Sequence, residues 1–364
     1  METVAICSPN IKKLYPKSKI QEFSFCDIDI PVGILPIETY NYDFRTNNDV
    51  LIEVKSFSCN FRDRALLIDF NSKCRLLSTQ GRVMYSPFGS DFVAVIKKIA
   101  PNVKSLKIGD RVIPNCHYYD LTGVSKGIPT NYASQRILVF HEEMLVKIPD
   151  SMPDEVAASF SIASQTIYSM VRKTSIKQGE NVLVTAPTSN TSLAAIKALK
   201  NKGCKIFATS SNHKNEEFLL SWGVDQFIPA ETLRRDGSNK IFFDVVIDPY
   251  YDLYLNGVIN HINFNGRYIF CGYYAQYTTI EKSKQLFEED YKGIFLKCMI
   301  KNISVIGNCL GTTNDLENAV KDYSEDKYNI LIDSVYSGVD VILFLERSYK
   351  DPSRIGKVVY SYTD

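Results

Sequence analysis

A turn rich in hydroxyl and amide side chains, residues 187–192 with the sequence PTSNTS, lies between a short apolar run and an amphipathic segment. Backbone N–H groups at the start of a helix bind phosphate, and glycine normally lines such turns because it lets the backbone approach a dinucleotide pyrophosphate. Here Ala186, Ser189 and Ser192 stand where glycine would be expected. The residue types therefore predict a bound dinucleotide whose phosphates lie slightly farther out. The expected contacts come from the N–H groups and side chains of Ala186, Ser189, Asn190, Thr191 and Ser192.

A second group of hydroxyl side chains ends the strand that follows. The apolar run of residues 204–211, CKIFATSS, ends at Ser210 and Ser211, and Lys214 comes three residues later. Enzymes that bind NAD place an acid near this point to bond the ribose 2′-hydroxyl, and an acid there would repel a 2′-phosphate. Hydroxyls beside an ammonium favour a phosphate instead. Ser210, Ser211 and Lys214 therefore predict NADPH rather than NADH.

Alternating strand-like and helical segments carry both groups of residues. Between residues 180 and 300, short apolar runs alternate with amphipathic segments, which predicts a parallel, doubly wound sheet. Residues 154–173 open with acids after Pro153 and are expected to form one helix. Residues 1–150 and those after 300 consist largely of short strand-like runs between polar or Gly/Pro turns. The sequence thus predicts an α/β segment inserted into β-rich material.

Composition excludes several classes of partner. Of the 364 residues, 42 are basic and 41 are acidic, which leaves no electrostatic footprint for nucleic acid or an anionic membrane. No apolar run approaches the length of a membrane span. The nine cysteines are scattered and never form a C-x-x-C pair, which favours reduced thiols and a cytoplasmic location over a disulfide framework or a zinc knuckle.

Six further segments, together with the strand–turn–helix unit around residues 187–192, resemble the medium-chain dehydrogenase/reductase superfamily in order and in register. These segments are VLIEVKSFSCNFRDRALL, PFGSDFVAVIKKIAPNVKSLKIGDRV, NYASQRILV, FDVVIDP, NFNGRYIFCG and GKVVY. The resemblance implies an α/β protein with a GroES-like, β-rich catalytic domain and a Rossmann nucleotide-binding domain with a doubly wound parallel sheet. The expected limits are residues 1–150 and 301–364 for the first domain and 151–300 for the second.

The resemblance also predicts that no metal is bound. Zinc alcohol dehydrogenases place ligands where this chain has Asn60, Ser90 and a residue near Ile162. Catalytic zinc needs about three nitrogen, sulfur or carboxylate ligands, and none of these side chains is a good one. The phrase Asn60-Phe61-Arg62-Asp63 instead looks like the quinone oxidoreductase and enoyl reductase branch, which reduces activated C=C bonds with NADPH.

Metal-free reduction of a C=C bond conjugated to a carbonyl needs hydride at the β-carbon and stabilisation of the enolate charge. The catalytic candidates in the first domain are Asn60, Asp63, Tyr85 and His117, with Arg62 as a further possible donor. Asn60 and Asp63 either line the pocket or hold the turn. His117 follows the Gly-Asp-Arg-Val segment and is one candidate for the acid, with solvent as the alternative.

Three more residues are expected to contact the cofactor. Thr166 lies in the segment expected to form a helix, and Cys271 and Gly272 end a strand that would border the nicotinamide. The missing side chain of Gly272 either leaves room for the ring or simply suits a turn.

The substrate class depends on the glycine-free turn. That turn looks like the dehydroalanine reductases of lanthipeptide biosynthesis, so the first expectation is reduction of dehydroalanine to D-alanine in a dehydrated peptide. Tyr273, Tyr274 and Tyr277 would then line a peptide groove, although aromatic clusters more often pack in a core. Two alternatives stay open. One is a reductase of a small-molecule alkene (a quinone, an enone or an enoyl thioester), and the other is a non-catalytic dinucleotide-binding protein.

A homodimer is the expected assembly. The segment 302–312, NISVIGNCLGT, lies where the superfamily joins the edges of two nucleotide-domain sheets. An apolar edge strand left unpaired would be prone to aggregation.

Overall fold

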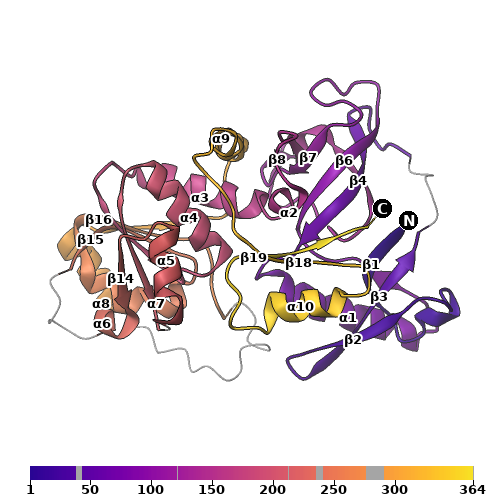
Figure 1. The fold of residues 1–364 in the computed structure, drawn as a ribbon, viewed down its shortest axis with the longest axis horizontal. Helices are drawn as coiled ribbons and strands as arrows, with labels where there is room; N and C mark the ends of the chain where they lie inside the picture. Colours follow the sequence, from indigo (N-terminus) through magenta and orange to yellow (C-terminus); the bar gives the residue numbers. More distant parts are fainter. Residues whose placement is uncertain (38–42, 121, 212, 235–240, 276–290, 364) are drawn as a thin grey trace. The chain divides into compact units, whose positions relative to one another are not determined.

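The computed structural model describes residues 1–37, 43–120, 122–211, 213–234, 241–275 and 291–363. The chain forms two compact units, the first made of Met1–Ile162 with Ile332–Asp364 and the second of Ala163–Leu331 (Figure 1). The expected domain limits were residues 150 and 300. Strand β17 and helix α9 lie beyond residue 300 and still belong to the second unit, because β17 hydrogen-bonds to the sheet of that unit.

The first unit contains an antiparallel sheet, a larger mixed sheet whose last two strands along the chain pair in parallel, and a short hairpin. One sheet has the order β2-β3-β1-β5, and its strands are β1 (Glu2–Cys7), β2 (Ile20–Phe25), β3 (Ile28–Pro36) and β5 (Tyr85–Ser86). The larger sheet has the order β11-β7-β6-β4-β19-β18, with β10 also paired to β4. Its strands are β4 (Asp49–Ser58), β6 (Asp91–Ile99), β7 (Arg111–Pro114), β10 (Ile137–His141), β11 (Leu145–Lys147), β18 (Ile332–Ser337) and β19 (Lys357–Ser361). Strands β8 (Tyr118–Tyr119) and β9 (Ser125–Lys126) form the hairpin.

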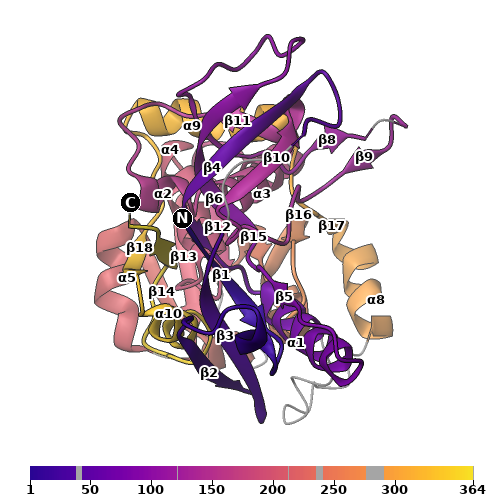
Figure 2. The same ribbon diagram turned by 90° about the vertical axis from the view of Figure 1, so that its right-hand side faces the viewer.

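Three helices pack against the sheets of the first unit. They are α1 (Asp63–Thr79), α2 (Asp154–Ala157) and α10 (Val341–Tyr349), with 3-10 turns at Ile11–Lys13 and Glu142–Met144. Helix α1 packs beside β1 and β3 (Figure 2). Because α1 follows β4 after a turn of four residues, this packing fixes where that turn lies.

An aromatic cluster holds the end of β4 in place. The Phe57 ring lies 5.3–5.9 Å from four others, those of Phe88, Phe344, Tyr360 and Tyr362. Aromatic pairs at such separations contribute beyond the area that they bury. The cluster therefore joins β4 to β19 and α10, and it lies three residues before Asn60.

The second unit is built on six parallel strands in the order β14-β13-β12-β15-β16-β17. They are β12 (Asn181–Thr185), β13 (Lys205–Ser210), β14 (Gln226–Pro229), β15 (Phe243–Asp248), β16 (Ile262–Phe270) and β17 (Ser304–Gly307). The direction of strand succession reverses between β12 and β15. Ligands of open parallel sheets bind at this switch point, outside the carboxyl ends of the strands.

The helices of the second unit cover its sheet, and the expected α/β fold class is confirmed. They are α3 (Ser161–Thr174), α4 (Asn190–Asn201), α5 (Glu216–Trp222), α6 (Ala230–Arg234), α7 (Tyr251–Val258), α8 (Tyr291–Lys301) and α9 (Thr313–Ser324), with 3-10 turns at His213–Asn215 and Ile259–His261. Helix α4 buries Leu193, Ile196 and Leu199, as their spacing predicts. Among the described residues, no helix combines the length and apolar composition needed to cross a bilayer.

The single helix expected over residues 154–173 is two helices, α2 and α3, separated at residues 158–160. The Ser159 hydroxyl bonds the carbonyl of Glu155, and the Ile162 N–H at the start of α3 donates to Asp91 at 3.1 Å. Side chains that bond nearby backbone groups compete with the helical pattern. Ile162 and Asp91 both belong to the first unit, so this hydrogen bond fixes the first residues of α3 beside the first residue of β6 within that unit.

Candidate active site

A turn of four residues, 59–62, connects β4 to α1 in the first unit. The Asp63 carboxylate accepts a hydrogen bond from the Asn60 N–H at 2.8 Å, and the Asp63 N–H donates to the Asn60 carbonyl at 2.9 Å. The Asp63 side chain is fully buried, and burial raises its pKa while its hydrogen bonds from Asn60 and Ser90 lower it. Asp63 therefore holds the turn that presents Asn60.

The Asn60 side chain lies inside a closed network. Its amide nitrogen donates to the Ser90 hydroxyl at 3.0 Å and to the Asp91 carboxylate at 2.9 Å. The Ser90 hydroxyl in turn donates to Asp63 at 2.6 Å. Both N–H bonds of the Asn60 amide are used within the protein, so Asn60 orients its neighbours and has no N–H left for a substrate.

The ammonium of Lys357 completes this network from β19. Its Nζ lies 2.6 Å from the Asn60 side-chain oxygen and 3.5 Å from Asp91, with the lysine side chain 5% exposed. Burial lowers the Lys357 pKa, while the charges of Asp91 and Asp63 raise it. A buried charge is stable only when it is paired and hydrogen-bonded, and this ammonium is both. The sequence reasoning did not find Lys357.

These residues do not fit a catalytic zinc ion. Of the three expected ligand positions, Asn60 and Ser90 are committed to each other and to neighbouring charges, and the third, Ile162, is apolar. Within the described ranges, no group of three or more His, Cys, Asp or Glu side chains could hold a metal. Zinc needs about three such ligands.

Arg62 lies beside the network with its guanidinium at the surface. One nitrogen, Nη1, donates to Asp63 at 3.0 Å and to Asn131 at 2.9 Å. The Arg62 side chain is 35% exposed, whereas that of Asp63 is 1% exposed. The guanidinium is thus held at one edge and open to solvent at the other.

In the second unit, the glycine-free turn follows β12 with an unusual backbone. Ala186 has a φ of +44°, a left-handed value that glycine adopts without strain. Ser189 then caps α4, accepting a hydrogen bond from the Ser192 N–H at 3.2 Å. The turn keeps the backbone shape that glycine normally supplies, so it fits a dinucleotide phosphate at the helix N-terminus.

The hydroxyls of this turn divide into two groups. The Ser192 hydroxyl is buried and donates to the Thr185 carbonyl at 2.7 Å, so it faces the strand. Ser189, Asn190 and Thr191 are half-buried. The Ser189 hydroxyl donates to the Ser192 hydroxyl at 3.0 Å, so both hydroxyls are bonded within the turn. The contacts of the turn with phosphate stay predictions.

A buried carboxylate that the sequence reasoning missed ties three strand ends together. Asp248 accepts hydrogen bonds from the Thr185 hydroxyl at 2.7 Å and the Tyr268 hydroxyl at 2.5 Å. Burial raises the Asp248 pKa to about 6. One side chain therefore joins the carboxyl ends of β12 and β15, which flank the switch point, to Tyr268 near the end of β16.

At the end of β13, Ser210 is half-buried, and Ser211 and Lys214 are exposed. His213 lies just before Lys214 in the chain, and its two ring nitrogens are 3.7 Å from Glu216 and 3.9 Å from Glu231. His213 therefore faces acids. Any preference for a 2′-phosphate has to come from Ser210, Ser211 and Lys214.

Glycine is required at position 272 because the backbone of Pro249 lies close to it. A β-carbon there would lie 2.3 Å from the Pro249 carbonyl oxygen, a distance that no side chain can occupy. The neighbouring Cys271 donates its N–H to the Asp248 carbonyl at 3.2 Å. The turn explanation of Gly272 therefore suffices. Thr166 is 6% exposed on α3.

The tyrosines after Gly272 pack on α7. Tyr273 stacks on Tyr251 with 5.6 Å between ring centroids, and Tyr274 meets Tyr250 edge-on at 5.6 Å. Tyr277 lies outside the described residues. The described rings therefore form part of a packed cluster.

Two catalytic candidates have surroundings of their own in the first unit. Tyr85 packs in an apolar cluster with Cys7 and Ile11, and its ring meets Tyr15 edge-on. The half-buried His117 ring lies 5.5 Å from Tyr119, edge-on. These contacts set both residues apart from the packing around Phe57.

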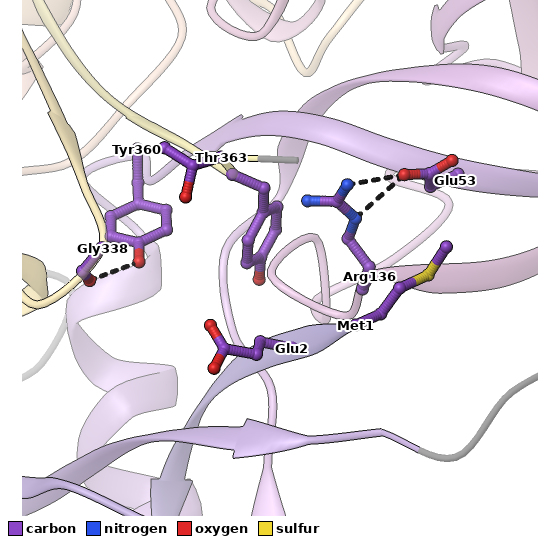
Figure 3. Close-up of a pocket in the computed structure, with 8 residues that line it drawn as sticks. Met1, Glu2, Glu53, Arg136, Gly338, Tyr360 and Thr363 are labelled. Carbon is purple, nitrogen blue, oxygen red and sulfur yellow. Dashed lines mark hydrogen bonds and ion pairs between the residues drawn. The ribbon is translucent and has the colours of Figure 1, made fainter.

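A cavity of about 340 Å³ opens elsewhere in the first unit (Figure 3). Its polar wall is the buried pair of Arg136 and Glu53, 2.5 Å apart, with the Tyr360 hydroxyl bonded to the Gly338 carbonyl. Burial opposes ionisation of Glu53, but hydrogen bonds from Lys97 and Arg136 lower its pKa to about 2. The buried charges of this cavity neutralise each other, which is typical of a structural site.

Comparisons with known proteins agree with this architecture. A family model described as an alcohol dehydrogenase GroES-like domain matches residues 46–150, and one described as a zinc-binding dehydrogenase matches residues 191–325. An acryloyl-coenzyme A reductase of Sulfurisphaera tokodaii is 24% identical over 86% of this chain and 92% of its own length. A mycocerosic acid synthase-like polyketide synthase of Mycobacterium tuberculosis is 28% identical over 52% of this chain, and the match spans only 8% of that synthase.

A solved structure extends the agreement to the whole chain. The thermostable alcohol dehydrogenase of Pyrobaculum aerophilum superposes with a TM-score of 0.72 at 22% identity, covering 99% of this chain and 100% of the dehydrogenase. At this identity the likeness concerns the fold. The two family models, which match parts of the two units in the expected order, and this shared fold together show that the chain belongs to the medium-chain dehydrogenase/reductase superfamily.

Proposed function

We propose that this protein is a zinc-independent, NADPH-dependent reductase of a C=C bond conjugated to a carbonyl, with an enoyl thioester as its acceptor. The observation that carries the proposal is the closed network of Asn60, Ser90, Asp91 and Lys357. It fills the position of the metal site of zinc-dependent relatives with side chains bonded to one another. The acryloyl-coenzyme A reductase relative supports the acceptor class, because its match covers 92% of its length.

The chemistry asks little of the protein beyond positioning and charge stabilisation. A bound NADPH supplies hydride to the β-carbon of the acceptor. The site must then stabilise negative charge that develops on the carbonyl oxygen, and preorganised donors do this without reorganising. Asp63 and Lys357 serve this end indirectly, because they hold the turn and Asn60 in place. Water can protonate the α-carbon.

NADPH is proposed over NADH on the residues at the end of β13. Strand β13 ends at Ser210, and Ser211 follows it, at the place where NAD enzymes carry an acid. The exposed Lys214 comes three residues later. Because His213 faces Glu216 and Glu231, we assign it no part in this preference.

Dehydroalanine in a peptide remains the alternative acceptor. Its chemistry, hydride to a terminal =CH₂ followed by α-protonation, suits the same site. The thioester is favoured because Tyr273 and Tyr274, which were expected to line a peptide groove, pack against the tyrosines at the start of α7.

One set of assays separates the possibilities. NADPH oxidation is followed at 340 nm with crotonyl-CoA, with a quinone and with a dehydroalanine-containing peptide, each with and without a chelator. Turnover of crotonyl-CoA that resists the chelator is expected. Turnover of the peptide alone would refute the thioester proposal, and loss of activity with the chelator would refute zinc independence. A protein that binds NADPH and turns over none of these acceptors would be the non-catalytic member.

A homodimer is proposed from the edge of the parallel sheet. Strand β17 pairs with β16 on one side, and its Val305 is 39% exposed. The neighbouring α8 exposes four large apolar side chains, those of Phe295, Leu296, Met299 and Ile300. An apolar edge of this kind is stabilised when a second copy pairs with it.

A further inference from the structure

We propose that Arg62 is a catalytic residue that donates hydrogen bonds to the carbonyl oxygen of the acceptor as that oxygen becomes an enolate. The inference rests on the proposed function and names the donor that this function requires. It starts from the Arg62 guanidinium at the edge of the Asn60 network.

Arg62 keeps donors that its neighbours do not use. A guanidinium has five N–H bonds, and the two on Nη1 donate to Asp63 and Asn131. Among the described residues, no contact engages Nε or Nη2. With 35% of the side chain exposed, these three N–H bonds are open to a ligand.

The other polar groups of the network are already committed. Both N–H bonds of Asn60 are donated inside the protein, and Ser90 donates its one hydroxyl proton to Asp63. The Lys357 side chain is 5% exposed, so its ammonium acts from within. We therefore assign the role of hydrogen-bond donor to the substrate to Arg62, two residues after Asn60 in the same turn.

The protein holds the Arg62 guanidinium rigidly. Asp63 is fully buried and accepts hydrogen bonds from the Asn60 N–H and the Ser90 hydroxyl. Asn131, in another loop, accepts a hydrogen bond from the same Arg62 nitrogen that contacts Asp63. A planar guanidinium held at one nitrogen loses little further freedom when it meets an oxygen. Such preorganisation is what makes a donor effective in a transition state.

The step balances without a proton from arginine. Hydride from NADPH forms the new bond at the β-carbon, the C=C electron pair moves to the α-carbon and carbonyl oxygen, and NADP⁺ is formed. Arg62 donates hydrogen bonds to that oxygen and stays protonated, because a guanidinium does not ionise in proteins. Water then protonates the α-carbon and restores the carbonyl.

The test compares Arg62→Gln with a matched variant, Arg75→Gln. Arg75 lies on α1, which follows the turn that carries Arg62, and its guanidinium donates to the Asp29 carbonyl and to the Asn71 side-chain oxygen. With NADPH and crotonyl-CoA, Arg62→Gln is expected to lower kcat by about 100-fold to 1,000-fold. The dissociation constant of NADPH should stay unchanged in both variants, and Arg75→Gln should keep the activity of the wild-type protein.

Two further measurements separate catalysis from support of the turn. Arg62→Lys keeps the charge beside Asp63 and should fold and retain partial activity, and added methylguanidinium should raise the rate of Arg62→Gln but not that of Arg75→Gln. If wild-type protein reduces crotonyl-CoA and Arg62→Gln does so within threefold, the Arg62 inference is wrong and the proposed function stands. If wild-type protein turns over no alkene, the proposed function fails and the inference with it. A loss of activity in Arg62→Gln that neither lysine nor methylguanidinium restores would also overturn the catalytic role.

Discussion

Replacing Ala186 by glycine should stabilise the protein, although glycine substitutions usually weaken one. Ala186 has a φ of +44° at the turn between β12 and α4. A left-handed conformation costs an L-residue about 1–2 kcal/mol, because its β-carbon approaches the following carbonyl oxygen. Glycine has no β-carbon and removes that cost.

The gain is partly offset in the unfolded chain. Glycine has more conformations to lose on folding than alanine, which costs about 0.4–1 kcal/mol. The difference leaves Ala186→Gly more stable by about 0.5–1 kcal/mol. In a unit of this size, such a gain raises the melting temperature by about 1–4 °C.

The assay is thermal and urea unfolding of both proteins without cofactor, with Ala194→Gly as the matched control. Ala194 lies in the buried face of α4, where glycine costs about 1 kcal/mol or more. The two substitutions therefore have opposite expected signs within one strand–turn–helix segment. A melting temperature of Ala186→Gly that falls as far as that of Ala194→Gly would refute the argument that Ala186 is strained.

Three further predictions concern the second unit. Asp248 has a pKa near 6 in the folded state and an ordinary value of 3.8, so the folded state favours its protonated form and stability falls as pH rises between these values. Between pH 4 and pH 7, the free energy of unfolding in urea should therefore fall by about 3 kcal/mol less in Asp248→Asn than in the wild-type protein. An equal fall in both proteins would contradict the buried carboxylate. Ser210→Asp should lower kcat/KM with NADPH by at least tenfold and leave that with NADH unchanged or higher, whereas an equal loss with both would contradict the assigned position of the 2′-phosphate. If the proposed dimer forms through β17, Val305→Lys should convert it to a monomer in analytical ultracentrifugation, with Lys297→Ala on α8 as the control. A dimer that persists in Val305→Lys would mean that β17 is not the interface.

The fold could be predicted from local patterns because each of its strands and helices has a recognisable pattern within a short stretch of sequence. The parallel strands are continuous apolar runs such as VLVT in β12, and a turn or helix signal follows each. The break between α2 and α3 could not be read in this way. It depends on Asp91, a residue 71 positions away whose carboxylate bonds the Ile162 N–H. A helical pattern carries no sign of a distant acceptor.

In the candidate site, too, residues close together in the sequence could be predicted, and a distant one could not. Asn60 and Asp63 were found because they lie three residues apart and resemble a known phrase, but the residue that completes their network is 297 positions from Asn60. Strand β19 brings Lys357 there because it pairs antiparallel with β4, placing Val359 opposite Ser58. A lysine at the start of the apolar run KVVYS, buried as soon as the strand begins, is the only local sign of it.

The buried position of Lys357 also supports the proposal of metal-free chemistry at this turn. An amide such as Asn60 has no charge and would leave the buried carboxylates of Asp63 and Asp91 uncompensated. The ammonium of Lys357 offsets them from inside, while the guanidinium of Arg62 does so from the surface with N–H bonds to spare. Two acids with two cations give a local charge near zero in the resting site. In the proposed reaction, the enolate would bring one extra negative charge to Arg62, beside a cluster that is neutral overall. Stabilising that charge would require no movement of the protein.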